Sequence, residues 1–283
     1  MPKRLKQILS GSIPTADLTG VYNSYDIVGD IAIIRLEPKP VKHRASIAET
    51  IMAVHMNVKT VLEQEGAVHG DFRLRKLTYL AGQKKTATLH NESGCTFKVD
   101  VEQCYFSPRL SNERMRIAEQ VRKGEIVVNM FAGVGCFSIL IAKHSEAERV
   151  YSIDLNPDAI GYAEENVRLN KVYGRVMPIL GDAKEVIEGR LRHVADRVLM
   201  PLPEKASEYL PLAILALTTK GGRIHYYDFE HAANEAEAIV KLKARVSDRL
   251  RGLDVAHIIV SGRVVRSTGP RWCQVVLDID VQP

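Results

Sequence analysis

The sequence predicts an α/β protein, in which a small α+β domain precedes a Rossmann-like, mostly parallel sheet of seven strands. Two observations carry this prediction. From residue 125 onward, strand and helix patterns alternate, as expected for parallel strands joined by crossover helices. Before residue 108, short strand patterns follow one another with turn signals between them, as in an antiparallel sheet. The length of 283 residues accommodates both domains.

The first part of the chain is expected to contain an arm and the small domain. Residues 1–20 show no clear periodicity and predict a short N-terminal arm. The α+β domain, residues 21–108, begins with a strand at 26–36 and a helix at about 45–63. Short strands are then expected at 74–81, 87–91 and 95–100.

A linker helix and the larger domain follow. Residues 109–124 form the linker, with a helix over about 111–123, and residues 125–283 form the Rossmann-like domain. Its strands are expected near 126–130, 150–153, 176–180, 196–200, 222–228, 256–262 and 273–281, and its helices near 136–144, 158–170, 183–192, 205–217 and 231–251. The link at 267–271 is too short for a parallel crossover, so the last two strands are predicted to be antiparallel neighbours.

A glycine turn follows the first strand of the larger domain. The strand at 126–130 is apolar and β-branched, as a strand buried on both faces should be. It leads into Phe131-Ala132-Gly133-Val134-Gly135, where the glycines allow a tight turn and close approach of the backbone to a ligand. A dinucleotide site requires a third glycine, near Ser138, and none is there.

Acidic residues end the next two strands. Asp154 follows the strand at 150–153, about 20 residues beyond Gly135, the spacing at which a carboxylate accepts both ribose hydroxyls. Asp182 follows the strand at 176–180 and can accept from an adenine amino group. Each acid alone is also consistent with a turn residue or a helix N-cap. Ribose and base contacts without a phosphate loop favour S-adenosylmethionine over NAD, and the strand pattern matches a class I methyltransferase sheet.

Composition narrows the class of protein. Hydrophobic residues make up 46% and charged residues 26%, as in ordinary globular proteins. No apolar run reaches 18 residues, so no membrane segment is expected, and the basic N-terminus lacks the apolar core of a secretory signal. The four cysteines are scattered without a Cys-x-x-Cys motif, which indicates a reducing cytoplasm and no metal site. A net charge of +5 permits a nucleic-acid partner without requiring one.

Four segments carry a resemblance to a known family. They are Tyr25-Asp26-Ile27-Val28-Gly29-Asp30-Ile31-Ala32, Phe106-Ser107-Pro108-Arg109-Leu110 with Glu113-Arg114, Phe131-Ala132-Gly133-Val134-Gly135, and Asp154-Leu155-Asn156-Pro157. Over about residues 22–283 the chain resembles the archaeal tRNA (guanine-37-N1)-methyltransferases. The resemblance implies a cytoplasmic class I methyltransferase that is a monomer and binds the tRNA anticodon loop. A sister family, in the wybutosine pathway, transfers an aminocarboxypropyl group from the same cofactor.

The resemblance also assigns roles to residues. N1 of guanine carries a proton, so methylation needs a base to remove it and a donor to stabilise charge on O6. The resemblance places the base on Glu113 and the assisting arginine on Arg73, with Arg75 as the neighbouring candidate. Without the resemblance, Glu113 is consistent with a helix N-terminal carboxylate stabilised by the dipole. The expected cofactor-binding residues are Ser107, Arg114, Phe131, Gly133, Gly135, Asp154, Leu155, Asp182 and Ala183.

Three departures from the family pattern concern the substrate and the site. Pro201 stands where the family has an asparagine that helps hold the guanine edge. Because proline has no side-chain donor and no amide hydrogen, guanine is expected to be held near Pro201 by backbone carbonyls or by another residue. Asn129 replaces an aspartate that usually ends the first strand. Only about 20 residues precede the Tyr25 motif, so the family's additional N-terminal domain is expected to be missing or vestigial.

Three functions therefore stay open, with methylation favoured. Glu113 after Ser-Pro-Arg-Leu and the Asp-Leu-Asn-Pro segment favour methyl transfer. The short N-terminus and the lost asparagine are closer to the aminocarboxypropyl transferase. A non-catalytic tRNA-binding module is the third possibility, and the joint presence of Glu113, Arg114, Asp154 and Asp182 argues against it.

Overall fold

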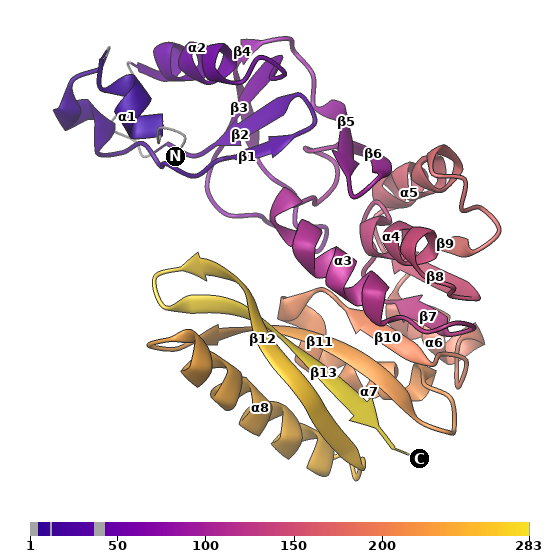
Figure 1. Cartoon of the computed structure of the whole chain (residues 1–283). Coiled ribbons are helices and arrows are strands. Elements are labelled where there is room, and N and C mark those ends of the chain that lie inside the picture. The colour runs from indigo at the N-terminus through magenta and orange to yellow at the C-terminus, as the bar shows by residue number, and fades with distance from the viewer. Residues whose placement is uncertain (1–4, 12, 37–42, 283) are drawn as a thin grey trace. The chain divides into compact units, whose positions relative to one another are not determined.

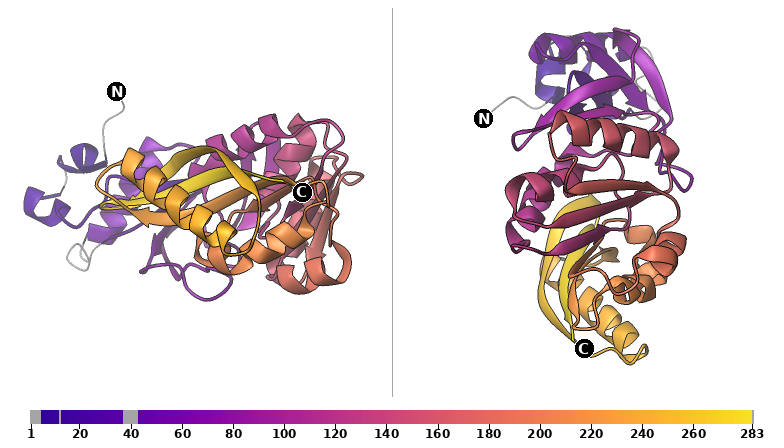
Figure 2. Two further views of the ribbon diagram at one scale, coloured as in Figure 1. Left: turned by 90° about the horizontal axis from the view of Figure 1, so that it is seen from below. Right: turned by 90° about the vertical axis from the view of Figure 1, so that its right-hand side faces the viewer.

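The computed structural model describes residues 5–11, 13–36 and 43–282 of the chain. It divides into two compact units, Met1–Arg109 and Leu110–Pro283 (Figures 1 and 2). None of the helices in these described ranges combines the length and apolar character that a membrane-spanning segment needs.

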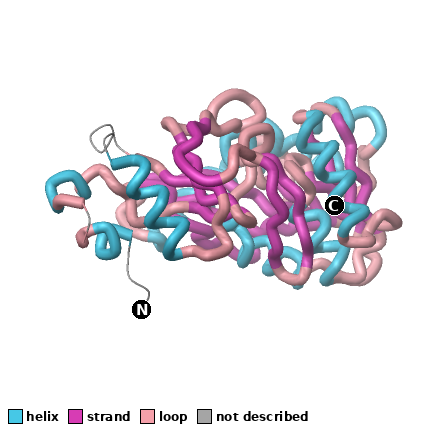
Figure 3. The backbone as a smooth tube through the Cα atoms, turned by 90° about the horizontal axis from the view of Figure 1, so that it is seen from above, coloured by secondary structure: helices cyan, strands magenta, loops and turns pink. Residues whose placement is uncertain are grey.

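A four-stranded sheet in the order β1-β2-β3-β4 forms the centre of the first unit. β2 and β3 are parallel and are joined through helix α2 (Arg44–Val54), whereas the outer pairs are antiparallel. From residue 55 to 107 the chain contains strands and loops without an α-helix (Figure 3). The strands of this unit are β1 (Asp26–Val28), β2 (Ile31–Ile34), β3 (Thr60–Gln64), β4 (Leu77–Gly82) and the separate hairpin β5 (Ala87–Glu92) and β6 (Cys95–Asp100).

Two elements of this unit differ from the sequence-based prediction. The single strand expected at 26–36 is a hairpin, because Gly29 adopts a φ of 56° and turns the chain between β1 and β2. The helix expected at 45–63 ends at Val54, and Thr60–Gln64 forms the fully buried strand β3. The spacing of the apolar residues did not separate the two, because a short apolar run fits a helix and a buried strand equally well.

The N-terminal segment also differs from the expected arm. Within it, Leu5–Leu9 forms helix α1 and Thr15–Leu18 forms the 3-10 helix η1. Leu5, Leu9 and Leu18 are buried in one hydrophobic core with residues of α2 and β3. The described residues of this segment therefore contribute to the core of the first unit.

The second unit contains the predicted seven-stranded sheet, in the order β12-β13-β11-β10-β7-β8-β9. The five strands from β11 to β9 in this order are parallel, and β13 lies antiparallel between β11 and β12. The predicted Rossmann-like fold is thus confirmed, including the antiparallel C-terminal pair. The strands are β7 (Ile126–Asn129), β8 (Arg149–Asp154), β9 (Val176–Leu180), β10 (Arg197–Met200), β11 (Gly222–His231), β12 (His257–Gly269) and β13 (Trp272–Val281).

Helices cover both faces of this sheet. One group comprises α3 (Ser111–Gln120), α4 (Cys136–His144) and α5 (Pro157–Leu169), and the other comprises α6 (Ala183–Arg190), α7 (Ala206–Ala216) and α8 (Glu235–Arg251). The long helix α8 lies along the β12–β13 hairpin (Figure 2). α8 starts later than the predicted 231–251 because β11 extends to His231, in register with Trp272 of β13.

Candidate active site

The carboxyl ends of β7, β8 and β9 meet at one edge of the second unit's sheet, since these strands are parallel neighbours. The segment Phe131–Gly135 follows β7, Asp154 ends β8 and Asp182 follows β9. In open α/β sheets this edge is where ligands bind. The structure therefore brings the predicted glycine turn and both predicted acids to the same edge.

Both glycines of the turn have conformations that suit glycine. Gly133 has a φ of 56° and Gly135 a φ of 88°, in the left-handed region. A Cβ on Gly135 would lie 3.2 Å from Cδ1 of Ile139 and 3.5 Å from Cβ of Ala163. The left-handed φ of Gly135 therefore favours glycine at the turn into α4, whereas an added Cβ would meet Ala163 of α5 at an ordinary contact distance.

Asp154 is held in place by backbone donors on both oxygens. Gly133 N–H donates to Oδ2 over 2.6 Å, and Asn156 N–H donates to Oδ1 over 2.9 Å. A backbone hydrogen bond from Leu155 also acts on this carboxylate. Since a carboxylate offers about four lone-pair sites, Asp154 keeps acceptor capacity beyond these donors. Burial raises the pKa of Asp154, against the effect of these backbone donors. Leu155 beside it is 46% exposed, and contact of these two residues with the ribose and adenine of S-adenosylmethionine stays a prediction.

Asp182 is the N-cap of α6. Its Oδ1 accepts from Lys184 N–H over 2.7 Å, and Tyr209 O–H lies 3.1 and 3.0 Å from its two oxygens. The Tyr209 ring in turn meets Phe131 edge to face, with 5.2 Å between centroids. Ala183, the first residue of α6, is buried. The N-cap role that the sequence left open is thus observed, and acceptance from an adenine amino group stays a prediction.

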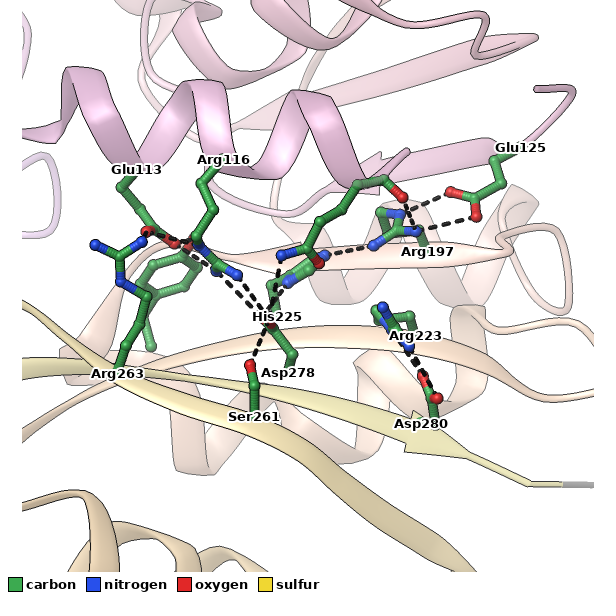
Figure 4. A network of polar contacts seen from close by, with 12 residues as sticks. Glu113, Arg116, Glu125, Arg197, Arg223, His225, Ser261, Arg263, Asp278 and Asp280 are labelled. Atoms are coloured by element: carbon green, nitrogen blue, oxygen red, sulfur yellow. Dashed lines mark hydrogen bonds and ion pairs between the residues drawn. The ribbon is translucent and has the colours of Figure 1, made fainter. Parts of the chain in front are cut away.

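Glu113 lies in the first turn of α3, and its side chain is 2% exposed (Figure 4). Arg116 binds it with two bonds, from Nη2 to Oε1 at 2.7 Å and from Nε to Oε2 at 2.9 Å. Tyr227 of β11 donates its hydroxyl to Oε1 over 2.7 Å, and burial raises the pKa of this phenol well above its usual range. Nη1 of Arg263 lies 3.7 Å from Oε2. Within the described chain, Oε1 therefore accepts two hydrogen bonds and Oε2 accepts one.

Arg116 also binds a second carboxylate, Asp278 of β13. Nη1 donates to Oδ2 over 2.6 Å and Nη2 to Oδ1 over 3.1 Å. Burial alone would raise the pKa of Asp278, but hydrogen bonds from His225 and Arg116 hold it well below its usual range. Burial likewise opposes the charge on Arg116, yet its bonds to Glu113 and Asp278 raise its pKa. The guanidinium thus bridges two buried carboxylates.

The other predicted residues fall in both units. Arg114 is buried on α3, and Pro201 is half-buried directly after β10, both in the second unit. Ser107, which is buried, and Arg73 belong to the first unit, which is a different unit from that of Glu113.

The two arginine candidates of the first unit differ in their surroundings. Arg75 is buried, and its Nη2 donates to the Phe106 carbonyl over 2.6 Å. Arg73 is half-buried, and its guanidinium carbon lies 4.3 Å from the centroid of the Tyr105 ring. Arg75 thus helps to hold the chain near Phe106, and the assisting role expected for Arg73 stays a prediction.

Asn129, the departure at the end of β7, is fully buried. Its Nδ2 donates to Oγ of Ser138 over 3.2 Å, and Ser138 and Ser152 share a hydrogen bond of 2.8 Å. The amide therefore joins a short polar chain between β7, α4 and β8. In the described ranges, no cluster of three or more His, Cys, Asp or Glu side chains is arranged to hold a metal ion.

The sequence-based reasoning missed the partners of Glu113. The sequence indicated Arg116 as a neighbour of Glu113, because a position three residues further along a helix lies on the same face. Asp278 was also indicated, as a charged residue inside the apolar run Val275 to Val281. Tyr227 was not indicated, since its meeting with Glu113 depends on how α3 packs on the sheet.

Comparison with known proteins identifies the family. Residues 88–255 match the model of the TRM5/TYW2 methyltransferase domain, and residues 5–86 match the TYW2 N-terminal domain. The chain belongs to the TRM5/TYW2 methyltransferase family. The predicted family and its S-adenosylmethionine dependence are thereby confirmed.

Curated members of the TRM5/TYW2 family are similar over most of the chain. Trm5b of Pyrococcus abyssi, a tRNA (guanine(37)-N(1))-methyltransferase, is 41% identical over 258 residues, which span 91% of this chain and 74% of that protein. Taw21 of Saccharolobus solfataricus, a tRNA 4-demethylwyosine(37)-methyltransferase, is 40% identical over 93% of this chain and 95% of its own. An aminocarboxypropyltransferase of Methanocaldococcus jannaschii is 37% identical over 72% of this chain and 77% of its own.

Solved structures of family members match the fold. A complex of aTrm5 with tRNALeu has a TM-score of 0.84 at 34% identity, covering 99% of this chain and 78% of that one. TYW2 of M. jannaschii in complex with AdoMet has a TM-score of 0.68 at 28% identity, covering 92% of this chain and 99% of that one.

Proposed function

We propose that this protein transfers a methyl group from S-adenosylmethionine to N1 of guanine 37 in tRNA, with Glu113 as the general base. The observation that carries the proposal is the Glu113 carboxylate, which is buried and oriented by Arg116 and Tyr227. Among the described residues, its Oε2 keeps acceptor capacity. The sheet edge with Asp154, where the cofactor is expected to bind, lies in the same unit as Glu113.

The cofactor supplies one half of the proposed chemistry. S-adenosylmethionine, when bound, supplies an electrophilic methyl group on its sulfonium. Asp154 and Leu155 would hold its ribose and adenine, and Ser107 and Arg114 are proposed as further contacts.

Side chains of the protein would supply the other half, the acceptance of a proton and the stabilisation of charge on the base. Glu113 Oε2 would accept the N1 proton of guanine as N1 attacks the methyl group. A cation such as Arg73 would stabilise the negative charge that develops on O6.

The proposed substrate is the anticodon loop of tRNA, which contains position 37. The similarity to a protein solved with tRNALeu supports this partner. Action as a monomer in the cytoplasm is part of the same proposal. The guanine edge would be held near Pro201 by backbone carbonyls, because this residue lacks the donor groups of the family asparagine.

A second candidate is methylation of 4-demethylwyosine at the same tRNA position. It is supported by the 40% identity to Taw21 over 266 residues, similar to that to Trm5b. Pro201 also supports it, since the residue that would read an unmodified guanine edge is replaced. The sequence also left aminocarboxypropyl transfer open as an alternative. Its support is the aminocarboxypropyltransferase of M. jannaschii, which matches a smaller share of this chain, 72%.

Labelled cofactor distinguishes these reactions. The protein is incubated with unmodified tRNA or with tRNA that carries 4-demethylwyosine, and with S-adenosylmethionine labelled on the methyl group or on the carboxypropyl carbons. Methyl label in the unmodified tRNA, located at N1 of guanine 37, is the expected result. Methyl label only in the 4-demethylwyosine tRNA favours the second candidate. Entry of the carboxypropyl label overturns both methylation proposals.

A further inference from the structure

We infer that Asp278 is a positioning residue for Glu113: through Arg116 it holds the Glu113 carboxylate in the orientation that accepts the substrate proton. This inference rests on the proposed role of Glu113 and extends it to Asp278, which has no part in the proposed function. Arg116 and Asp278 lie 162 residues apart in the sequence. Only the packing of α3 on the sheet brings Asp278 to the Glu113 site (Figure 4).

The bridge between the two carboxylates uses all three nitrogens of the Arg116 guanidinium. Two of its hydrogen bonds go to Glu113 and two go to Asp278, at distances from 2.6 to 3.1 Å. The guanidinium is planar, and its donors form a rigid fork. With one side of the fork fixed on Asp278, the other side presents its donors to Glu113 in a single orientation.

Asp278 is itself fixed from two neighbouring strands and from α3. His225, its register partner on β11, lies with Nδ1 2.6 Å from Oδ1. Ser261 of β12 donates its hydroxyl to Oδ2 over 2.8 Å, and Gln120 of α3 lies 3.4 Å from the same oxygen. The anchor of Arg116 is therefore part of the sheet rather than a mobile surface group.

The proton on His225 is placed by Arg197. Nη1 of Arg197 lies 2.7 Å from Nε2 of His225. Since arginine can only donate, Nε2 must accept, and the imidazole proton lies on Nδ1, facing Asp278. Arg197 is held in turn by Glu125, with bonds of 2.7 and 3.0 Å. A continuous polar chain thus runs from Glu125 through Arg197, His225, Asp278 and Arg116 to Glu113 (Figure 4).

A matched control lies two residues away on the same strand. Asp280 also pairs with an arginine, and in the described part of the protein its hydrogen bonds go to Arg223, at 2.7 and 2.9 Å. Its side chain is 41% exposed, whereas that of Asp278 is 4% exposed. Asp280→Asn therefore removes an arginine-paired carboxylate from β13 without touching Arg116 (Figure 4).

The test compares turnover of Asp278→Asn and Asp280→Asn with that of the wild type, using methyl-labelled cofactor and unmodified tRNA. Asp278→Asn is expected to lower kcat by about 10-fold or more, because a reacting group held loosely loses its alignment. Its KM for tRNA and its affinity for S-adenosylhomocysteine should stay within about twofold, because the proposed role of Asp278 is to orient Glu113 rather than to bind either ligand. Asp280→Asn should keep kcat within about twofold.

A double-mutant cycle with Glu113→Gln separates positioning from a general structural effect. If Asp278 acts through Glu113, Asp278→Asn should have little further effect on kcat in the Glu113→Gln background. Equal losses of kcat in both backgrounds, or wild-type kcat for Asp278→Asn, overturn the inference. If Glu113→Gln itself keeps wild-type turnover, the proposed base fails first, and that result is distinct from a failure of Asp278 alone.

Arg116→Lys provides a second route if Asp278→Asn does not fold. Lysine keeps the positive charge but lacks the fork that joins the two carboxylates. We expect the same loss of kcat and the same lack of additivity with Glu113→Gln. Wild-type kcat for a folded Arg116→Lys protein contradicts the inference.

Discussion

His225 and Asp278 face each other across β11 and β13, and the imidazole Nδ1 lies 2.6 Å from the carboxylate Oδ1. The pair is buried between the sheet and α3, and Arg197 on the other side of the ring fixes the imidazole as a neutral donor. Consistent with this, burial lowers the pKa of His225 from its ordinary value of 6.5. The pair therefore affects the stability of the fold through His225 and the orientation of Glu113 through Asp278.

The stability of the protein should fall as the pH drops below about 6.5. The unfolded state then gains a proton on His225. In the folded state, burial and the nearby cations Arg197 and Arg116 keep the ring neutral, against the opposite effect of Asp278. More protons on the unfolded state mean that the free energy of unfolding decreases, by at most about 1.4 kcal/mol per pH unit for one group. His225→Asn, which keeps a donor toward Asp278, should flatten this slope.

Urea unfolding between about pH 5 and 7.5, a range that spans the ordinary pKa of histidine, measures this effect. His225→Gln serves as the companion variant, because it also removes the titrating ring but places its amide nearer Arg197. Both variants should show the flatter profile, and His225→Asn should be the more stable of the two. Profiles parallel to that of the wild type would show that His225 does not titrate differently on unfolding.

Glu113→Gln should reduce turnover by about 100-fold or more while leaving cofactor affinity intact, if Glu113 is the general base. The amide keeps the size of the side chain but cannot accept the proton. Single-turnover rates and calorimetry with S-adenosylhomocysteine provide the two measurements. Glu119→Gln, at an exposed position of the same helix, is the control and should match the wild type. Unchanged turnover of Glu113→Gln removes Glu113 from the mechanism.

Asp154→Ala should weaken binding of S-adenosylhomocysteine by about 10-fold or more, because it removes a charged acceptor for the ribose hydroxyls. Asp154→Asn should lose less, since its amide keeps one acceptor oxygen. Asp158→Ala, at an exposed position in the first turn of α5, is the control. Equal affinity of all three variants and the wild type in calorimetry argues against Asp154 as a cofactor contact.

Two glycine substitutions should change stability in opposite directions. At Gly29 the φ is 56°, and an added Cβ would collide with the carbonyl oxygen of Leu89. Gly29→Ala should therefore lower the free energy of unfolding by about 1–3 kcal/mol. Gly161 lies inside α5, and a Cβ added there would have no atom within 4 Å. Gly161→Ala should therefore raise the free energy of unfolding by about 0.5–1 kcal/mol. Chemical denaturation of each variant gives both values, and a shift of the same sign in both contradicts this account.

The larger fold was predictable because its signals are local. Glycine and acidic residues at the ends of Ile126–Asn129, Arg149–Asp154 and Val176–Leu180 mark parallel strands, and parallel strands bring those ends to one edge. The strand β3 was missed because a run of apolar residues has the same appearance in a helix and in a buried strand.

The sequence alone determined the Rossmann-like sheet, the edge at which Gly133, Asp154 and Asp182 meet, and Glu113 as the candidate base. Only the tertiary structure decided what holds Glu113. Arg116 reaches Asp278 through the packing of α3 on the sheet, and His225 and Asp278 meet through the antiparallel register of β11 and β13. Register and helix packing depend on contacts summed over the whole sheet, so no local pattern encodes which buried charges far apart in the sequence become partners.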